Sequence, residues 1–398
     1  MPDASGKSTV RTLNAGVIGF GWMGRLHANG YRQLSWRYPE LGASVRLAMV
    51  ADAAESNREV AREQGFAKVV SDYRELLADP DIDVVSIGLP SFLHREVALA
   101  TAAAGKPFWI EKPMGLSAEQ SREITQAASA AGVITGVGFN YRNQPAVARA
   151  RELIRAGALG RISSARVWLL ADYASSPEGA YTWRFSADAG PGVISDLLSH
   201  GVDLVHYLLG RIDSLTAQSG IFIAERPLPL GEGAGQWATE VSDEVKTVEN
   251  EDYAAVLART AKGAMVTLEC SRVAVGPRAE YVVEVYGSEG SLRWNFQHPM
   301  DLQVIRRGER GYALQMCAPG DGEFGRYQPG PGLQLSFDDA KTVEAKNFIQ
   351  SVLTGRQLVP SAADAWQAAE VSDAIVRSNA NRSWEEVPTV TGPVTYND

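Results

Sequence analysis

GVIGFGWMG, at residues 16–24, is the stretch that decides the fold of this chain. An apolar run from Leu13 leads into the pattern Gly19-x-Gly21-x-x-Gly24, and a helix-like stretch follows. Gly19 permits a tight turn, Gly21 lets the backbone approach a pyrophosphate, and Gly24 lets helix and strand pack closely. The helix N-terminus offers N–H groups to phosphates. The pattern predicts a dinucleotide site made by Gly19, Phe20, Gly21, Trp22, Met23 and Gly24, with a tight turn that binds no ligand as the alternative.

Short apolar runs alternate with amphipathic stretches as far as about Phe139. The predicted strands are Leu13–Gly19, Val45–Asp52, Val84–Leu89, Phe108–Glu111 and Ile134–Gly138. The predicted helices are Glu55–Gln64, Arg95–Ala104 and Ser117–Ala131, the last with a capping box Ser117-x-x-Gln120. Gly105 stands where a helix C-terminal glycine is expected. Alternating strands and helices, with strands apolar along their length, predict a parallel Rossmann sheet covered on both faces.

The pattern changes after residue 140. Helices are predicted at Pro145–Ala156, Val193–Leu209, Asp338–Thr354 and Ala362–Asn379. Strand-like runs occur at Arg161–Leu170, Ser214–Ile223, Tyr253–Arg259, Ala264–Arg272, Tyr281–Tyr286, Ser291–Asn295 and Leu302–Arg306. Residues 224–250 and 318–332 are interpreted as inserted loops. We expect an α/β protein with a disordered tail at 1–12, a Rossmann domain at 13–139, and a second α/β domain at 140–398 with a mostly antiparallel sheet.

Composition limits the possible partners. The chain has 398 residues, 45% of them hydrophobic, which fits two domains. Its formal net charge of −9 disfavours nucleic acid or an anionic membrane as a partner. Its two cysteines, Cys270 and Cys317, lack the spacing of a disulfide framework or zinc site. The N-terminal stretch is polar, and no apolar run is long enough to span a bilayer. A cytoplasmic location is expected.

Asp52, at the end of the second predicted strand, bears on the choice of dinucleotide. A carboxylate there accepts hydrogen bonds from ribose hydroxyls and repels a 2′-phosphate, and Ala53 and Ala54 follow it rather than an arginine. The spacing from the glycines is longer than the usual interval of about 20 residues, which an insert around Ser35–Ala43 would explain. Asp52 predicts NAD rather than NADP; a helix-capping role is compatible with this.

The fifth predicted strand ends in Glu111-Lys112-Pro113. Ligands of open parallel sheets gather beyond the carboxyl ends of the strands, so Lys112 is expected where a nicotinamide would lie. A partly desolvated lysine there suits proton transfer. A surface lysine at a strand end is the alternative.

The helix from Val193 carries Asp196, His200, Asp203 and Tyr207 at steps of four, three and four, which predicts one polar stripe on an apolar helix. Histidine titrates near neutrality and can take a hydroxyl proton, and the carboxylate one turn earlier can orient the imidazole or hold a substrate hydroxyl. A structural Asp–His pair is the alternative. A metal held by Asp196, His200 and Asp203 is disfavoured, because no further ligand cluster accompanies them.

Taken together, these motifs make the chain similar to the Gfo/Idh/MocA oxidoreductases. The matching pieces are GVIGFGWMG, Pro90 and His94 in LPSFLH, EKP at 111–113, VGFNYR at 137–142, DLLSH at 196–200, and the closing helices with NRSWEEV. The resemblance implies a C-terminal domain whose large open sheet forms a homodimer or homotetramer. It implies that Pro90, His94, Glu111 and Lys112 lie at the cofactor and that Asp196 and His200 are a catalytic pair. Ser91 departs from the asparagine that many members carry.

Residues 168–185 are rich in aromatic side chains: Trp168, Tyr173, Tyr181, Trp183 and Phe185, beside Arg184. Aromatic faces pack on the C–H faces of sugar rings, so with the resemblance this stretch suggests a pyranose or cyclitol substrate; aromatic filling of an inter-domain core is the alternative. The expected substrate ligands are Lys112, Tyr141, Arg142, Trp183, Arg184, Asp196 and His200.

The leading hypothesis is an NAD-dependent oxidation of a ring hydroxyl of a sugar, anhydrosugar or cyclitol to a ketone or lactone. His200, oriented by Asp196, takes the hydroxyl proton while Lys112 steadies the oxyanion; a role for Lys112 as the base stays open. A glycoside hydrolase that uses transient oxidation by NAD and a non-catalytic NAD-binding protein are the two other hypotheses.

Overall fold

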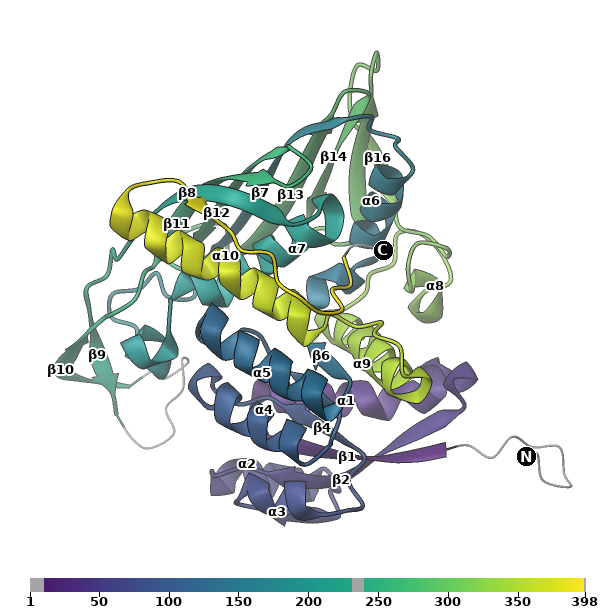
Figure 1. Ribbon diagram of the computed structural model, residues 1–398, viewed down its shortest axis with the longest axis vertical. Coiled ribbons are helices and arrows are strands. Elements are labelled where there is room, and N and C mark those ends of the chain that lie inside the picture. Colours follow the sequence, from purple (N-terminus) through teal and green to yellow (C-terminus); the bar gives the residue numbers. More distant parts are fainter. Residues whose placement is uncertain (1–10, 231–239, 397–398) are drawn as a thin grey trace, which may run out of the picture.

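The computed structural model describes residues 11–230 and 240–396 (Figure 1). Its first sheet contains six parallel strands in the order β3-β2-β1-β4-β5-β6. Val17 on the central strand β1 pairs with Val50 on β2 and with Ser86 on β4. The chain order reverses between β1 and β4, and in such sheets a ligand binds at this point. The strands are β1 (Arg11–Ile18), β2 (Ala43–Ala51), β3 (Lys68–Val70), β4 (Val84–Ile87), β5 (Phe108–Ile110) and β6 (Thr135–Val137).

Two features of this sheet differ from the sequence prediction. β3 was not predicted, because a three-residue strand with an exposed Lys68 shows no usable periodicity. β1 begins at Arg11, so residues 11 and 12 of the predicted tail are strand, and residues 1–10 lie outside the described residues.

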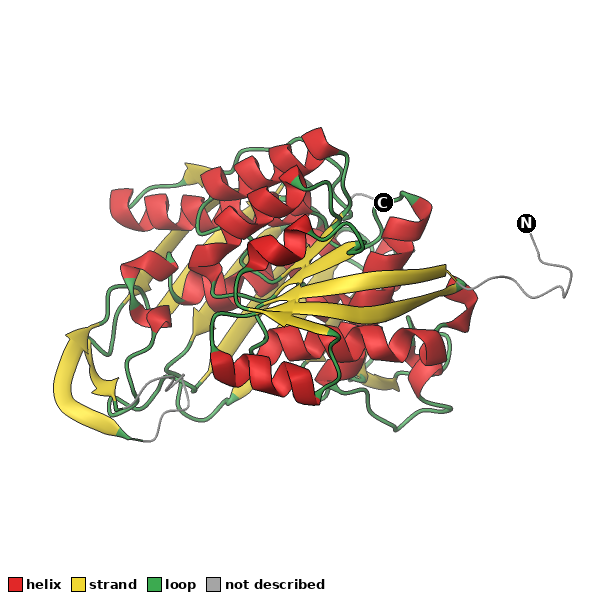
Figure 2. Ribbon diagram, turned by 90° about the horizontal axis from the view of Figure 1, so that it is seen from below, coloured by secondary structure: helices red, strands yellow, loops and turns green. Residues whose placement is uncertain are grey.

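Helices cover both faces of the parallel sheet (Figure 2). Successive side chains of a strand point to opposite faces. On β5, Phe108 and Ile110 therefore pack in the core that contains Ile124 of α5, and Trp109 packs with Tyr31 of α1 and Phe348 of α9. The helices of this part are α1 (Trp22–Arg37), α2 (Glu55–Glu63), α3 (Tyr73–Ala78), α4 (His94–Ala103) and α5 (Ala118–Ala131).

The predicted helix signals were partly right. Gly105, with φ +67°, follows the end of α4 as a C-terminal glycine. Ser117 caps α5 by accepting the Gln120 N–H at 3.2 Å, but the Gln120 side chain accepts from Leu116 N–H instead of from Ser117. Only half of the predicted capping box forms, because the Gln120 side chain reaches one residue past the cap.

The second sheet has nine strands in the order β16-β15-β14-β13-β7-β12-β11-β8-β17. Of the pairs between described residues, β7 with β12 is parallel and the others are antiparallel, as predicted. The strands are β7 (Ile162–Ala171), β8 (Ile212–Gly220), β11 (Tyr253–Thr260), β12 (Met265–Ser271), β13 (Ala279–Gly287), β14 (Gly290–Asn295), β15 (Asp301–Arg306), β16 (Ala313–Met316) and β17 (Glu385–Glu386).

The predicted loops contain regular structure. Residues 224–250 include an antiparallel pair, β9 (Glu225–Pro229) and β10 (Val241–Thr247), so the prediction of a loop there was wrong outside 231–239, which is not described. β9 carries two prolines and β10 is mostly exposed and polar, so neither shows an apolar alternation. Residues 318–332 hold the short helix α8 (Phe324–Tyr327).

Helices cover one face of the nine-stranded sheet: α6 (Pro145–Arg155), α7 (Ser199–Leu209) and α10 (Ala362–Asn381) (Figure 1). On β11, Ala254, Val256 and Ala258 are buried on this side, whereas Leu257 on the opposite side is 39% exposed. That opposite side forms an open groove of about 470 Å³ across β7, β8, β11 and β12. No described helix is long and apolar enough to cross a bilayer.

The last two long helices return to the first sheet. α9 (Phe337–Thr354) packs along α1, and α10 packs along α5. The approach of α1 and α9 is close: a Cβ on Gly30 would lie 3.2 Å from the Ala345 Cβ. Side chains of α9 therefore reach the region in which the glycine loop lies.

Candidate active site

The glycine loop has the geometry that a dinucleotide pyrophosphate requires. Gly19 has φ +84°, and a Cβ there would lie 2.8 Å from the Gly88 carbonyl oxygen. A Cβ on Gly24 would lie 1.9 Å from the Gly19 carbonyl oxygen, whereas a Cβ on Gly21 would meet nothing within 4 Å. The first turn of α1 has no side-chain cap and no acidic residue. Open space therefore faces unpaired N–H groups at a helix N-terminus, which suits a diphosphate.

Asp52 follows β2 and is bound to this loop. Its Oδ2 accepts the Phe20 N–H at 2.6 Å and the Asn57 amide at 3.2 Å, and its Oδ1 accepts the Ala54 N–H at 2.8 Å. Arg58 donates to the Asp52 carbonyl at 2.7 Å. The carboxylate thus supports the glycine loop and accepts the N–H of Ala54, the residue before α2. Since α2 has no side-chain N-cap, the helix-capping alternative foreseen for Asp52 is not borne out.

A cavity of about 420 Å³ lies between the two sheets, beyond the carboxyl ends of β4, β5 and β6. This volume suits a small-molecule site. Its walls include the predicted residues Trp22, Met23, His94, Glu111, Lys112, Tyr141, Trp183, Arg184, Asp196 and His200. The predicted nicotinamide region and the predicted catalytic helix thus meet in one cavity.

Lys112 and Asp196 are ion-paired inside the cavity. The Lys112 ammonium donates to the Asp196 carbonyl oxygen at 2.5 Å and to Asp196 Oδ1 at 3.2 Å. The Tyr173 hydroxyl donates to Asp196 Oδ2 at 2.7 Å. Burial opposes ionisation of Asp196, but Lys112, Arg184 and Tyr173 outweigh it and lower the pKa of this carboxyl below its ordinary value. Asp196 is therefore a carboxylate at neutral pH that holds the Lys112 ammonium.

His200 presents a neutral imidazole to the cavity. Burial, helped by the nearby Lys112 charge, lowers the pKa of His200 well below its ordinary value. Its Nδ1 is buried without a hydrogen-bond partner, which leaves Nε2 as the ring nitrogen open to the cavity. Tyr141 packs edge-on against the ring at 4.7 Å between centroids. A neutral, fixed imidazole is suited to accept a proton.

The helix that carries these residues is not a single α-helix. Residues Ile194–Leu198 form a π-helical turn, and α7 follows from Ser199. A π-turn has a different period from an α-helix, so the predicted stripe divides. Asp196 bonds Lys112 and Tyr173, and among the described residues no hydrogen bond joins it to His200. An orienting role of Asp196 for the imidazole therefore has no direct hydrogen bond to support it and stays a prediction.

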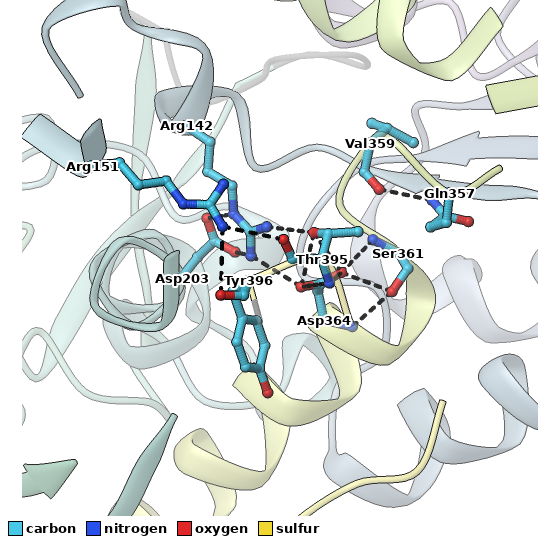
Figure 3. Close-up of polar contacts among 9 residues, drawn as sticks. All are labelled: Arg142, Arg151, Asp203, Gln357, Val359, Ser361, Asp364, Thr395 and Tyr396. Carbon is cyan, nitrogen blue, oxygen red and sulfur yellow. Dashed lines mark hydrogen bonds and ion pairs between the residues drawn. The ribbon is translucent and has the colours of Figure 1, made fainter. Parts of the chain in front are cut away.

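Arg142 and Asp203 lie in a separate buried cluster (Figure 3). Arg142 donates to both carboxylate oxygens of Asp203, with Nε to Oδ2 at 2.8 Å, and to Asp364 at 3.3 Å. Thr395, near the C-terminal end, accepts from Arg142 at 2.7 Å. Arg142 does not line the cavity, so the prediction of a substrate ligand at this position was wrong: the guanidinium neutralises carboxylates on α7 and α10 instead.

The aromatic stretch 168–185 also divides. Trp183 and Arg184 line the cavity, and the Arg184 guanidinium lies 4.5 Å from the Trp183 ring. Trp168 lies on the open face of the nine-stranded sheet. Tyr181 and Phe185 fill a small core with Val248 inside the second domain, and not the inter-domain core that was the alternative foreseen from the sequence.

His94, Pro90 and Glu111 shape the strand ends. Both His94 ring nitrogens lie near carbonyl oxygens, of Pro113 at 2.8 Å and Leu89 at 2.9 Å, and burial lowers the pKa of this histidine. Pro90 begins a short 3₁₀ turn and is not in the cavity wall. Glu111 accepts from His27 at 2.9 Å and Lys341 at 2.5 Å. These contacts hold the strand ends on which Lys112 depends.

Several cavity residues were missed as site residues by the sequence analysis. Tyr173 was noted only as one of a group of aromatic residues, and the polar or aromatic residues missed include Asn140, Arg272, Arg278, Tyr281, Phe337 and Lys341. Asn140 stands in the VGFNYR motif, but the others come from parts of β13, α9 and the neighbouring loops that carry no local motif. An arginine that ends the apolar run of β12 is the one local signal: Arg272 is buried and bonds Asp252 at 2.8 Å.

Comparison with known proteins is consistent with this geometry. Residues 13–139 match the oxidoreductase family's NAD-binding Rossmann fold, and residues 151–387 match the family's C-terminal alpha/beta domain. Levoglucosan dehydrogenase of Pseudarthrobacter phenanthrenivorans is 35% identical over 391 residues, which cover 96% of this chain and all of that protein. Inositol 2-dehydrogenase of Rhizobium meliloti is 28% identical over 377 residues, covering 93% of this chain and 98% of the relative.

Solved structures give the same result. A levoglucosan dehydrogenase in complex with NADH and L-sorbose superposes with a TM-score of 0.90 at 33% identity, covering 96% of this chain and all of that one. The chain belongs to the Gfo/Idh/MocA oxidoreductase family. The predicted family, fold class and NAD cofactor are confirmed, and so is the prediction of an NAD-dependent oxidoreductase.

Proposed function

We propose that the protein is a dehydrogenase that oxidises a ring hydroxyl of a sugar, anhydrosugar or cyclitol with NAD. The observation that carries the proposal is the junction of Lys112, Asp196 and His200 in one cavity beside the glycine loop. Aromatic and charged side chains, Trp183, Arg184 and Tyr173, border the same cavity. Similar dehydrogenases, named for levoglucosan and inositol, support this substrate class.

Each side chain of this group has a separate role in the proposed reaction. NAD, when bound, supplies the acceptor for the hydride that leaves the hydroxyl-bearing carbon. His200 accepts the hydroxyl proton at Nε2, since its imidazole is neutral and open to the cavity. The Lys112 ammonium, paired with Asp196, donates a hydrogen bond to the oxygen as its negative charge develops. Asp196 and Tyr173 fix the position of the ammonium. The geometry thus favours His200 over Lys112 as the base.

The experiment that tests the function is NADH formation by purified protein, followed by absorbance. The panel contains inositols, aldoses, anhydrosugars and glycosides, with NAD and NADP in parallel. A clear rate with one ring polyol and NAD is expected. Release of free sugar from glycosides with no net NADH would replace the proposal with an NAD-dependent hydrolase. NAD binding without turnover of any compound would replace it with a non-catalytic binding protein.

Asp52 is expected to set the preference for NAD. Asp52→Ser removes the charge that repels a 2′-phosphate, while Arg25 and Arg58 remain nearby through their contacts with Asn57 and the Asp52 carbonyl. The ratio of kcat/KM for NAD over NADP should fall about tenfold or more. A tenfold change corresponds to about 1.4 kcal/mol of lost discrimination against the 2′-phosphate. Kinetics with both cofactors measure this ratio. Asp81 precedes β4 and lies at the amino ends of the strands, away from the glycine loop. Asp81→Ser should therefore leave the ratio unchanged. An unaltered ratio in Asp52→Ser would refute the assignment.

We further propose that the protein forms a homodimer or homotetramer through the open face of its nine-stranded sheet. Trp168 and the 39%-exposed Leu257 lie on this face, and apolar surface of this kind is characteristic of an interface. Light scattering should give a mass two or four times that of the 42.9 kDa chain. Leu257→Glu should shift that mass toward one chain. A 42.9 kDa particle for the unmodified protein at micromolar concentration would contradict the proposal.

We also propose a cytoplasmic location and a small-molecule substrate, with neither nucleic acid nor membrane as a partner. Both cysteines, Cys270 and Cys317, are buried and unpaired, as in proteins of reducing compartments. The net charge of −9 disfavours polyanionic partners.

A further inference from the structure

Trp22 is placed unusually for a tryptophan. It is the first residue of α1, directly after Gly21, and 66% of its surface is exposed. Its indole stacks on the ring of Phe337, with centroids 5.8 Å apart and an angle of 18° between the planes. Both rings belong to the wall of the active-site cavity. The stack thus joins the glycine loop to a helix that follows in the chain more than 300 residues later.

The position of Phe337 is fixed by the start of α9. Ser336 and Asp339 form a complete capping box around it. One turn further on, the buried Lys341 donates to Glu111 at 2.5 Å, next to Lys112 in the chain. The next turn of α9 packs close to α1, where a Cβ on Gly30 would lie 3.2 Å from that of Ala345. The ring is therefore held in place before any ligand binds, and preorganisation of this kind favours binding.

We propose that Trp22 and Phe337 form an aromatic clamp over the diphosphate part of the dinucleotide, so that α9 is a component of the cofactor site. The proposal rests on dinucleotide binding at the glycine loop. The N–H groups of the first turn of α1 bind the diphosphate, and Trp22 lies in that turn. A stack across the mouth of this site shields the diphosphate from water, and it must open before the cofactor leaves. The clamp therefore slows cofactor release.

The test measures NADH binding alone and needs no substrate. NADH dissociation is followed by stopped-flow fluorescence, and the dissociation constant by calorimetry, for Phe337→Ala, Trp22→Ala and the double variant. Aromatic pairs contribute an amount that corresponds to about 2- to 12-fold in an equilibrium constant. Each single variant should raise the NADH dissociation rate by about that factor. Kd should change less, because the stack is also present in the protein without NADH. The double variant should release NADH at the same rate as the faster of the two single variants, because either change removes the same stack.

Matched controls separate the clamp from damage to the fold. Trp36→Ala removes a 73%-exposed tryptophan on the same helix, outside the cavity wall, and should bind NADH as the unmodified protein does. AMP, which lacks the second phosphate, should bind equally to all variants. Wild-type dissociation rates in Phe337→Ala, multiplicative effects in the double variant, or a matching loss of AMP affinity would each overturn the clamp. Absence of NADH binding by the unmodified protein would overturn the cofactor assignment instead.

Discussion

His200→Ala and Lys112→Met should each lower kcat by about 10²–10⁴-fold, which is the usual contribution of a positioned proton-transfer group. His200→Ala removes the neutral imidazole that accepts the proton, and Lys112→Met removes the ammonium that Asp196 holds beside it. Steady-state kinetics with the substrate identified by the panel, at saturating NAD, measure the effect. Because the glycine loop and Asp52 are the expected ligands of the dinucleotide, Kd for NADH should change far less than kcat in His200→Ala.

The dependence of kcat/KM on pH distinguishes the two candidate bases. The pKa of His200 is lowered well below its ordinary value by burial, so the rate should fall only as the pH drops into that low range and should stay level near neutrality. A level kcat/KM near neutrality would therefore support His200 as the base, whereas a titration of the rate at neutral or higher pH would contradict it. His298→Ala and Lys262→Met, two exposed positions outside the cavity wall, serve as controls and should retain full activity. Full activity in both His200→Ala and Lys112→Met would refute the mechanism.

Arg142→Met should lower the free energy of unfolding by about 3–5 kcal/mol, since it leaves buried carboxylates without their counter-charge. Arg142 is 5% exposed, and its partners Asp203 and Asp364 are 3% and 0% exposed. Urea unfolding measures the loss. Arg149→Met breaks an exposed ion pair with Glu152 and should cost less than about 1 kcal/mol. Adding Asp203→Asn to Arg142→Met should recover part of the stability, because it removes one of the stranded charges.

The loss in Arg142→Met should also grow with pH. Burial and the Asp364 charge, opposed by Arg142, raise the pKa of Asp203 to about 6. A carboxyl with a raised folded-state pKa stabilises below its unfolded pKa, and that stability is lost as pH rises through the folded value. Without Arg142 the pKa rises further, so the variant goes on losing stability above about pH 6 while the unmodified protein does not. A loss below about 1 kcal/mol, or one independent of pH, would contradict this account. At temperatures where the variant is folded, KM should be unchanged, whereas a raised KM would support the earlier assignment of Arg142 to the substrate.

The sequence predicted the fold and half of the site because those features are local. The turn at Gly19, the helix start at Trp22 and the alternation of apolar strands with helices depend on neighbouring residues alone. Lys112 and Asp52 could be predicted because they end strands of a parallel sheet, whose carboxyl ends share one edge. The polar, proline-containing pair β9 and β10 lacks a local pattern and was missed.

Only the tertiary structure decided which side chains meet. His200 and Arg142 both stand in recognisable motifs, yet one opens to the cavity and the other bonds Thr395, 253 positions away. Lys341 reaches Glu111 across 230 positions, and Tyr173 rather than His200 bonds Asp196. Periodicity assigns a residue to a face of its own helix or strand, but burial and charge pairing between distant elements select its partner. The sequence by itself thus determined a Rossmann domain with lysine, aspartate and histidine near its cofactor edge; the packing of α7, α9 and the C-terminal segment determined which of them act together.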